Sequence, residues 1–412
     1  MTTKKRVVIT GSSIASPLGN TPETYWQNLC RGHYGLGPIT TFDTSESKTK
    51  VGACLNPIPM PTNLTPLEEK MSSNLSLLSA YCAEQAILQA GLDFSQEDVR
   101  QAGVVMGSGF LNLYDLEDFY QGLYQANRPA SPTIIPLNMS SAPASRIAMT
   151  YGLKGVIKSV STACASGFTA ILDSVHLIRD GYQEIMLAGG SDLILCKTIV
   201  HAWERMRVLS KERENPTMVC RPFDKDRDGI ALGDGAAIFV LESLEHARQR
   251  GATILAEIVG GFQNADSLDL VKPDSKGEII CMEQALQEAN LEANAIDMIY
   301  AHATGTRLND VTEYQSMLAV FKEQLENIPV CGLKSMLGHT MGASGPMSLV
   351  AALGTLKSGY FYPIPNLNRL EEGVDLFITK TGQTLSDVHH ILINTFAFGG
   401  INVCLVVSTF RE

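Results

Sequence analysis

Short apolar runs bounded by glycine alternate along the chain with longer segments whose apolar residues recur at helical spacing. The short runs predict strands at residues 6–10, 102–107, 184–189, 236–241, 254–259, 298–301 and 391–394. The longer segments predict helices, for example at 75–91 and 168–179. Strands that alternate with helices are typical of layered α/β proteins, and this is the fold class that we predict.

One internal boundary is indicated near Gly251. The stretch 244–251 is rich in charge and predicts a helix that ends at this glycine, and a new strand follows at 252–259. Each side opens with a strand and later carries glycine-rich turns, which is compatible with two similar halves, residues 1–251 and 252–412, but no repeat is convincing by sequence alone. The aromatic and proline-containing segment 110–140 predicts an excursion from the layers, for which a buried subunit contact is favoured over a ligand site.

Composition excludes several classes of protein. Hydrophobic residues make up 45% of the 412 positions and charged residues 18%, which is typical of a globular protein and not of a disordered one. The net charge of −11 argues against a general affinity for nucleic acid or anionic lipid. Any polyanionic partner must therefore meet a local basic patch.

The apolar runs and the cysteines indicate a cytoplasmic protein. No run reaches the length of a membrane span, and the short one after the basic N-terminus predicts a strand instead of a signal peptide. The nine cysteines include no Cys-x-x-Cys pair, so neither a disulfide framework nor a zinc site is expected. This usage fits a reducing compartment.

Cys164 lies in a run of small residues, 162–167, between the apolar stretch 156–160 and the predicted helix 168–179. At such a strand-to-helix turn, unpaired amide donors and the helix dipole stabilise a thiolate. The setting indicates a nucleophile. Taken alone, a cysteine among small residues is more often a buried packing residue.

Two histidines with glycine neighbours strengthen that interpretation. His302 follows the predicted strand 298–301, and His339 follows Lys334 in the segment 334–339. A single histidine usually has a structural role, but two of them together with a lysine and a cysteine indicate an active site.

Two further motifs are ambiguous when read alone. The sequence Phe398-Gly399-Gly400 can form a mobile loop with backbone donors that gates a site or completes an oxyanion hole, and no Gly-Lys-Ser/Thr follows to make it a phosphate loop. The segment 221–229 alternates charges like a calcium loop, but Gly235 stands where the glutamate ligand is required. We interpret 221–229 as a salt-bridged turn and expect no metal.

In this order the motifs resemble those of the β-ketoacyl-[acyl carrier protein] synthases, most closely synthase II of fatty acid synthesis and the ketosynthase α subunits of type II polyketide systems. The resemblance extends from residues 6–11 to Asn402, essentially the full chain. It implies a thiolase-like fold of two βαβ-rich halves, stacked as five α-β-α-β-α layers, in a dimer. It also implies decarboxylative condensation of malonyl-acyl carrier protein with a cysteine-bound acyl chain, without a cofactor.

The resemblance assigns roles to particular residues. Cys164 is the acyl-accepting nucleophile, and His302 and His339 assist loss of CO₂ and stabilise the enolate. Lys334 supports this electrostatic arrangement. The remaining assignments are Glu313 and Asp310 for positioning, the amides of Cys164 and Phe398 for the oxyanion hole, Phe398 and Gly399 for the gate, and Thr304 and Thr306 for the pantetheine arm.

The acyl pocket and the docking surface are inferred from the same resemblance. Phe110, Trp203 and Phe398 are expected to line the acyl pocket, and we hypothesise that Phe110 shortens it or favours flat, conjugated chains. Lys70, Arg128 and Arg207 are expected to meet an acidic carrier protein, although ordinary solvated charges are the competing interpretation. Glu68 and Glu69 beside Lys70 indicate a dedicated carrier.

Four positions depart from the family pattern. Ala303 and Ala397 stand where relatives usually have glycine, Thr395 where they have serine and Ile401 where they have threonine.

Two competing functions fit the sequence less well. A coenzyme A thiolase would need a second catalytic cysteine in the C-terminal loop, where Phe398 stands. A non-catalytic chain-length partner typically lacks the cysteine. Pairing with a second copy and pairing with a chain-length-factor-like subunit both stay open, and a specialised polyketide or polyene pathway is favoured over general fatty acid elongation.

Overall fold

The computed structural model describes residues 4–412 and is built around a ten-stranded sheet. Five strands come from the N-terminal part of the chain, in the order β5 (Ile157–Val160), β4 (Ala102–Gly107), β6 (Ile185–Asp192), β7 (Gly235–Ser243) and β1 (Val7–Ala15). The other five mirror them in the order β10 (Val330–Cys331), β9 (Met298–Tyr300), β13 (His390–Ala397), β14 (Ile401–Ser408) and β8 (Ala256–Ala265).

The two groups of strands share one topology. Numbered within its own half, each group has the order third, second, fourth, fifth, first, and the parallel and antiparallel pairings also correspond. A short antiparallel pairing of β1 with β8, Val8 with Glu257 and Ile9 with Ala256, joins them. The predicted boundary at Gly251 lies between the helix α9 (Leu244–Gln249) and β8.

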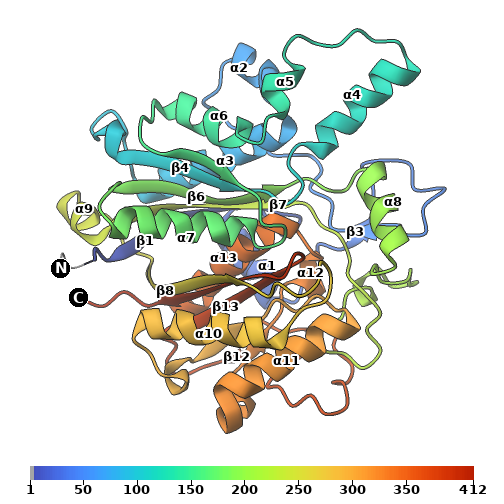
Figure 1. The fold of residues 1–412 in the computed structure, drawn as a ribbon, viewed down its shortest axis with the longest axis vertical. Helices are drawn as coiled ribbons and strands as arrows, with labels where there is room; N and C mark the ends of the chain where they lie inside the picture. Colours follow the sequence, from blue (N-terminus) through green and yellow to red (C-terminus); the bar gives the residue numbers. More distant parts are fainter. Residues whose placement is uncertain (1–3) are drawn as a thin grey trace.

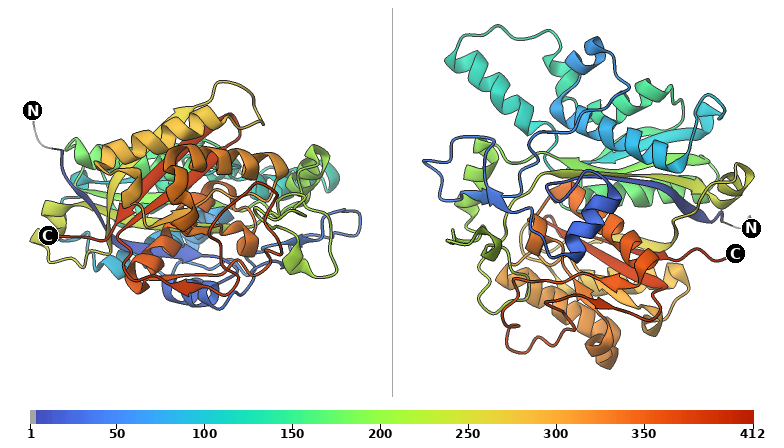
Figure 2. Two further views of the ribbon diagram at one scale, coloured as in Figure 1. Left: turned by 90° about the horizontal axis from the view of Figure 1, so that it is seen from below. Right: turned by 180° about the vertical axis from the view of Figure 1, so that it is seen from behind.

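The two groups of strands form two β layers, and helices above, between and below them complete five layers (Figures 1 and 2). One outer layer holds α3 (Asn74–Ala90) and α6 (Ala142–Tyr151), the central layer holds α7 (Ser166–Arg179) and α13 (Ser344–Ser358), and the other outer layer holds α10 (Ser275–Ala289) and α11 (Arg307–Phe321). The predicted thiolase-like α/β architecture with two pseudo-repeated halves is therefore confirmed.

The central helix α7 contacts strands of both groups, including β6, β4 and β14. Apolar side chains occur all around it, and Phe168, Ile171 and Val175 are fully buried. A helix that is apolar on every side is stable only inside a protein. This explains why the segment that follows Cys164 lies between the two sheet surfaces, and why its N-terminus is fixed in the interior.

Shorter elements surround these layers: α1 (Pro22–Cys30), α2 (Pro66–Lys70), α4 (Leu113–Gln125), α5 (Ile134–Asn138), α8 (Lys197–Met206), α12 (Lys334–Leu337), and the strand pairs β2 (Gly37–Pro38) with β3 (Val51–Gly52) and β11 (Tyr360–Phe361) with β12 (Gln383–Thr384). The predicted excursion at 110–140 contains α4, which projects from the upper layer, with Tyr124 76% exposed (Figures 1 and 2). Across residues 4–412, the helices are all too short or too polar to span a membrane.

Candidate active site

Cys164 lies just before α7, at the turn that the sequence predicts. Its side chain is almost fully buried, and Sγ lies 3.9 Å from Sδ of Met341. Burial raises the pKa of the Cys164 thiol to about 11, while the charge of Lys334 and the backbone N–H groups of Phe398 and Cys164 act to lower it. The resting group is therefore a protonated thiol surrounded by donors that favour negative charge.

His302 follows β9 and is held by Glu313 and Lys334. The backbone N–H groups of His302 and Ala303 donate to the two oxygens of Glu313, at 2.6 Å and 2.7 Å. Lys334 Nζ donates to the carbonyl oxygen of His302 and lies 3.4 Å from its Nδ1. The ammonium form of Lys334 has no acceptor and can only donate to Nδ1, which favours the imidazole tautomer with its proton on Nε2.

His339 has the same tautomer for a different reason. The backbone N–H of Met341 donates to His339 Nδ1 at 3.1 Å, and Ser344 Oγ lies 3.0 Å from the same nitrogen. A backbone N–H is always a donor, so Nδ1 accepts and Nε2 carries the proton. The rings of His302 and His339 meet edge to face with centroids 5.4 Å apart. The two histidines therefore supply a pair of neighbouring Nε2–H donors.

Burial, and then the charge of Lys334, lowers the pKa of both histidines well below the ordinary value. Both rings are thus neutral at neutral pH. Burial also lowers the pKa of Lys334, against the attraction of Glu313, and raises the pKa of Glu313 to about 7, against the backbone donors of Ala303 and His302. The site concentrates donors without holding a cationic imidazole.

The side chains of Cys164, His302 and His339 open on one cavity of about 810 Å³, a volume that includes open solvent, whereas Lys334 and Glu313 lie outside its lining. Its lining includes Cys164, Trp203, His302, Thr304, Thr306, His339 and Phe398. The cavity therefore gathers the predicted nucleophile, both predicted histidines, both predicted pantetheine residues and part of the predicted acyl pocket. Phe110 lies outside this lining, against Trp203, with ring centroids 6.3 Å apart.

The glycine-rich loop borders the cavity, with Phe398 and Gly400 in the lining. The ring of Phe398 stacks on Trp203, with centroids 5.7 Å apart and planes 22° from parallel. Gly399 has φ 84°, a left-handed conformation that favours glycine, and its N–H donates to the carbonyl of Leu270 at 2.8 Å. The N–H of Gly399 is therefore occupied, whereas that of Phe398 faces the thiol of Cys164.

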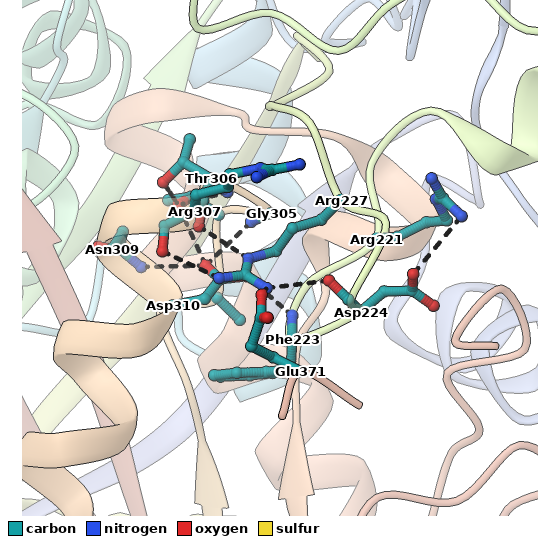
Figure 3. A network of polar contacts seen from close by, with 12 residues as sticks. Arg221, Phe223, Asp224, Arg227, Gly305, Thr306, Arg307, Asn309, Asp310 and Glu371 are labelled. Carbon is teal, nitrogen blue, oxygen red and sulfur yellow. Dashed lines mark hydrogen bonds and ion pairs between the residues drawn. The ribbon is translucent and has the colours of Figure 1, made fainter. Parts of the chain in front are cut away.

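Thr304, Thr306 and Asp310 belong to a network that also includes the charged turn 221–229 (Figure 3). Asp310 accepts the N–H groups of Phe223 and Gly305 at 2.8 Å and 3.1 Å, and its carboxylate lies 3.4 Å from Arg227. Arg227 is also paired with Glu371 at 2.6 Å and donates to the carbonyl oxygens of Asp224, Thr306 and Arg307. The interpretation of 221–229 as a salt-bridged turn is confirmed, and the turn supports the threonine side of the cavity.

The three expected docking residues are exposed but lie on different elements. Lys70 ends α2, Arg128 follows α4 and is 3.4 Å from Asp118, and Arg207 follows α8. Arg207 precedes Val208, which lines the cavity, so along the chain it is the one nearest to the lining. In Figure 1, α2 and α4 lie in the upper part of the molecule and α8 lies at the right edge.

Two buried residues beside the site were not predicted from the sequence. Asp192, at the end of β6, is fully buried and accepts hydrogen bonds from the segments on either side of the site. Met341 contacts Cys164 and fixes His339. An acid that interrupts the apolar surroundings Leu187–Ala188 and Leu193–Leu195 is the signal that could have indicated Asp192.

Family models match most of the chain. Residues 4–247 match the β-ketoacyl synthase N-terminal domain and residues 255–368 match the β-ketoacyl synthase C-terminal domain. The chain therefore belongs to the β-ketoacyl synthase family. Among its relatives, 3-oxoacyl-[acyl-carrier-protein] synthase 2 of Synechocystis is 34% identical over 412 residues, which cover 99% of both chains. The predicted enzyme class, a β-ketoacyl-[acyl carrier protein] synthase, is confirmed.

Two solved structures are similar over almost the full chain. The ishigamide ketosynthase/chain length factor has a TM-score of 0.91 and 30% identity, over 99% of this chain and 100% of the other. A type II polyketide synthase acyl-carrier protein in complex with its ketosynthase bound to the hexaketide, AntDE:AntF, has a TM-score of 0.90 and 26% identity, with the same coverage. Both proteins share the fold of this chain, and their sequence identities of 26% and 30% show that they resemble it in sequence as well.

Proposed function

We propose that the protein extends an acyl chain held on Cys164 by two carbons taken from malonyl-acyl carrier protein, with the residues of the cavity in the roles given below. The observation that carries this proposal is the shared cavity, on which the buried thiol of Cys164 and the side chains of His302 and His339 all open. The proposed reaction uses no cofactor, because loss of CO₂ drives it.

In the first step Sγ of Cys164 attacks the carbonyl carbon of the acyl thioester. The backbone N–H groups of Cys164 and Phe398, which already favour negative charge at Sγ, are suited to stabilise the oxyanion. The carbon–sulfur bond to pantetheine breaks, and the carrier leaves as its free thiol with the proton that Cys164 has lost. Thr304 and Thr306 line the same cavity and are suited to hold the pantetheine arm.

In the second step malonyl-acyl carrier protein occupies the same arm. The bond between C2 and the carboxylate breaks, CO₂ leaves, and the electron pair remains as a thioester enolate. The neutral His302 and His339, each with a proton on Nε2, are suited to donate to the enolate oxygen. C2 then attacks the acyl carbonyl, the bond to Sγ breaks, and the thiolate of Cys164 takes up a proton.

The partner is proposed to be an acyl carrier protein, since AntDE:AntF is a ketosynthase with its carrier. A second candidate arrangement is the catalytic subunit of a heterodimer with a chain-length-factor-like subunit, which the likeness to the ishigamide ketosynthase/chain length factor favours over a pair of identical chains. We propose a cytoplasmic setting, in keeping with nine free cysteines among the described residues.

Intact-protein mass spectrometry tests this function. The purified protein is mixed with a panel of acyl carrier proteins, and the expected result is an acyl adduct on the wild type and none on Cys164→Ala. Added malonyl-acyl carrier protein should discharge the adduct as a 3-oxoacyl product two carbons longer. Absence of any adduct, with and without a candidate second subunit, would contradict the proposed function.

The identity of the adduct distinguishes the pathways. Saturated long chains would indicate fatty acid elongation, whereas adducts confined to unsaturated or short chains would support a specialised polyketide or polyene pathway. The same measurement on Phe110→Ala tests the proposed pocket wall, because removing an aromatic ring behind Trp203 should admit longer chains. An unchanged range of chain lengths would show that Phe110 does not limit the pocket.

A further inference from the structure

Asp192 is a buried acid that accepts hydrogen bonds from four donors and has no role in the reaction described above. Its side chain is fully buried at the end of β6. One oxygen accepts from Ser108 Oγ at 2.6 Å and from the N–H of Phe110 at 3.1 Å. The other accepts from the N–H of Gly109 at 2.8 Å and from the N–H of Gly342 at 2.7 Å. A buried carboxylate is stable only when it is satisfied in this way.

The donors come from the two segments that flank Cys164. Residues 108–110 follow β4 and lead to the proposed acyl pocket, and Gly342 lies just beyond His339. An added methyl group at Gly342 would lie 2.8 Å from Asp192 and 2.9 Å from the nitrogen of Gly109, so the two segments are in close contact at the carboxylate. A methyl group at Gly109 would also lie 3.2 Å from the carbonyl oxygen of Ala163, the residue before Cys164.

Asp192 is coupled to His339 through consecutive backbone donors. The N–H of Met341 donates to His339 Nδ1, and the next N–H, of Gly342, donates to Asp192. Met341 has φ 47°, a left-handed conformation that is strained for a residue with a side chain. Such a conformation persists only where the surroundings impose it. The bond from Gly342 to Asp192 is part of what imposes it, and it keeps the N–H of Met341 directed at His339.

We propose that Asp192 is a positioning residue of the condensation site, whose carboxylate holds the acyl-pocket segment 108–110 and the turn after His339 in one fixed arrangement. The proposal rests on the proposed function, because it concerns the same site. The carboxylate also has an electrostatic effect, since its negative charge raises the pKa of Cys164, in opposition to Lys334. Removal of this charge should therefore lower the pKa of the Cys164 thiol as well as loosen the arrangement of the two segments.

Asp234 provides a matched control. It is equally buried, and burial raises the pKa of both acids to about 6. Its carboxylate accepts instead from the N–H groups of Ile194, Leu195 and Leu55, at 2.7, 3.1 and 3.4 Å. Replacing either acid by asparagine removes a charge and half of the acceptor atoms, so both variants should lose stability. Only Asp192 is bonded to the segments around Cys164 and His339.

The test compares Asp192→Asn with Asp234→Asn in the full-length protein. We measure thermal stability, kcat and KM for condensation, and the rate at which iodoacetamide alkylates Cys164 as a function of pH. For Asp192→Asn we expect kcat to fall at least about tenfold and KM to change less than about threefold, because misplaced donors stabilise the transition state less well. A tenfold fall in kcat corresponds to about 1.4 kcal/mol of transition-state stabilisation. We also expect its alkylation profile to shift to lower pH. Asp234→Asn should retain kcat within about twofold of the wild type and should keep the wild-type profile.

Equal losses of kcat in the two variants at equal loss of stability would overturn the proposal, because they would indicate a structural role only. The alkylation profile needs no carrier protein, so it decides the matter even if the wild type yields no 3-oxo product and the proposed function fails. In that case, an unshifted profile in Asp192→Asn overturns the proposal. If Asp192→Asn does not fold, Gly342→Ala takes its place in the test. The added methyl group must displace either Asp192 or Gly109, so a wild-type kcat in this variant would likewise overturn the proposal.

Discussion

At the scale of single residues, Ala303 shows how a departure from the family pattern affects the backbone. The family resemblance places glycine at this position. Ala303 has φ 48°, in the left-handed region that a side chain disfavours, and it is fully buried between His302 and Thr304. Its N–H donates to Glu313, which also receives the N–H of His302. The hydrogen bonds to Glu313 therefore hold this residue in a strained conformation.

Ala303→Gly should leave the stability of the protein nearly unchanged. Glycine removes a left-handed strain of about 1–2 kcal/mol, but the greater freedom of the unfolded chain and the loss of a fully buried methyl group return most of it, so the net change should stay within about 0.5 kcal/mol. Ala397→Gly is the matched control, since Ala397 ends β13 in ordinary strand geometry, where glycine should cost about 0.5–1 kcal/mol. Urea unfolding of both variants measures the difference. An Ala303→Gly variant that is destabilised at least as much as Ala397→Gly would show that Ala303 is not strained.

Residue patterns predicted much of the site because some of its chemistry is local. The small residues around Cys164 and the glycines around His302 and His339 are visible in short windows of sequence. The role of Asp192 is not, because its donors at 108–110 and at Gly342 lie far from it along the chain and meet it only after folding. The hydrogen bond between Gly399 and Leu270 is hidden for the same reason.

At the scale of elements, a buried acid attaches the helix α9 to the sheet. Glu242 on β7 is fully buried and receives hydrogen bonds from Thr10 on β1, His246 on α9 and Arg250 just beyond it. Burial alone would raise the pKa of Glu242, but these donors outweigh burial and lower it to about 2. The cluster therefore joins the last elements of the N-terminal half to its first strand.

The lowered pKa makes this attachment dependent on pH. A carboxyl group with a depressed pKa stabilises the folded state above its unfolded pKa of 4.5, and the contribution is lost as the pH falls from 4.5 through about 2. Glu242→Gln should therefore lower the free energy of unfolding at pH 7 by about 3 kcal/mol, since one pKa unit corresponds to about 1.4 kcal/mol. The variant should also lose the part of the acid dependence that Glu242 contributes.

Glu245→Gln on the exposed side of α9 is the matched control and should change stability by less than about 0.5 kcal/mol. Chemical denaturation between pH 3 and pH 7 measures both variants. A Glu242→Gln protein that keeps the wild-type stability and its acid dependence would contradict the assignment.

Periodicity in the sequence found the elements whose apolar pattern is strong. The predicted strand 102–107 coincides with β4, and the predicted helix 75–91 differs from α3 by one residue at each end. β14 was not predicted, although the apolar run 403–407 follows the glycine-rich loop directly. α4 is amphipathic but projects from the layers, so its pattern alone did not separate a helix from an irregular excursion.

At the scale of the whole molecule, a net negative charge contrasts with an exposed cation close to the cavity along the chain. The net charge is −11, yet Arg207 is exposed and precedes Val208, which lines the cavity. Carrier proteins present acidic surfaces, and a cation near the mouth would attract them while the rest of the molecule repels them. Arg207 is therefore the strongest of the three proposed docking residues, ahead of Lys70 and Arg128.

Arg207→Glu should raise KM for the carrier protein about fivefold, because an exposed charge pair contributes up to about 1 kcal/mol. The effect should diminish as salt is added. Alkylation of Cys164 by iodoacetamide should be unchanged, because it needs no carrier. Arg100→Glu, at the exposed approach to the opposite end of β4, is the control and should leave KM unchanged. Equal loss of turnover and of alkylation in Arg207→Glu would contradict a docking role.

The repeated strand order places Cys164 and His339 at equivalent positions of the two halves. Cys164 follows β5, the third strand of the first half, and His339 follows β10, the third strand of the second, each just ahead of a central helix. The two residues thus occupy related places in a duplicated plan and meet where the duplicates face each other. Neither copy holds a complete set of reacting groups. Catalysis consequently begins only when both copies have folded and closed on one another, so that activity itself reports the completion of folding.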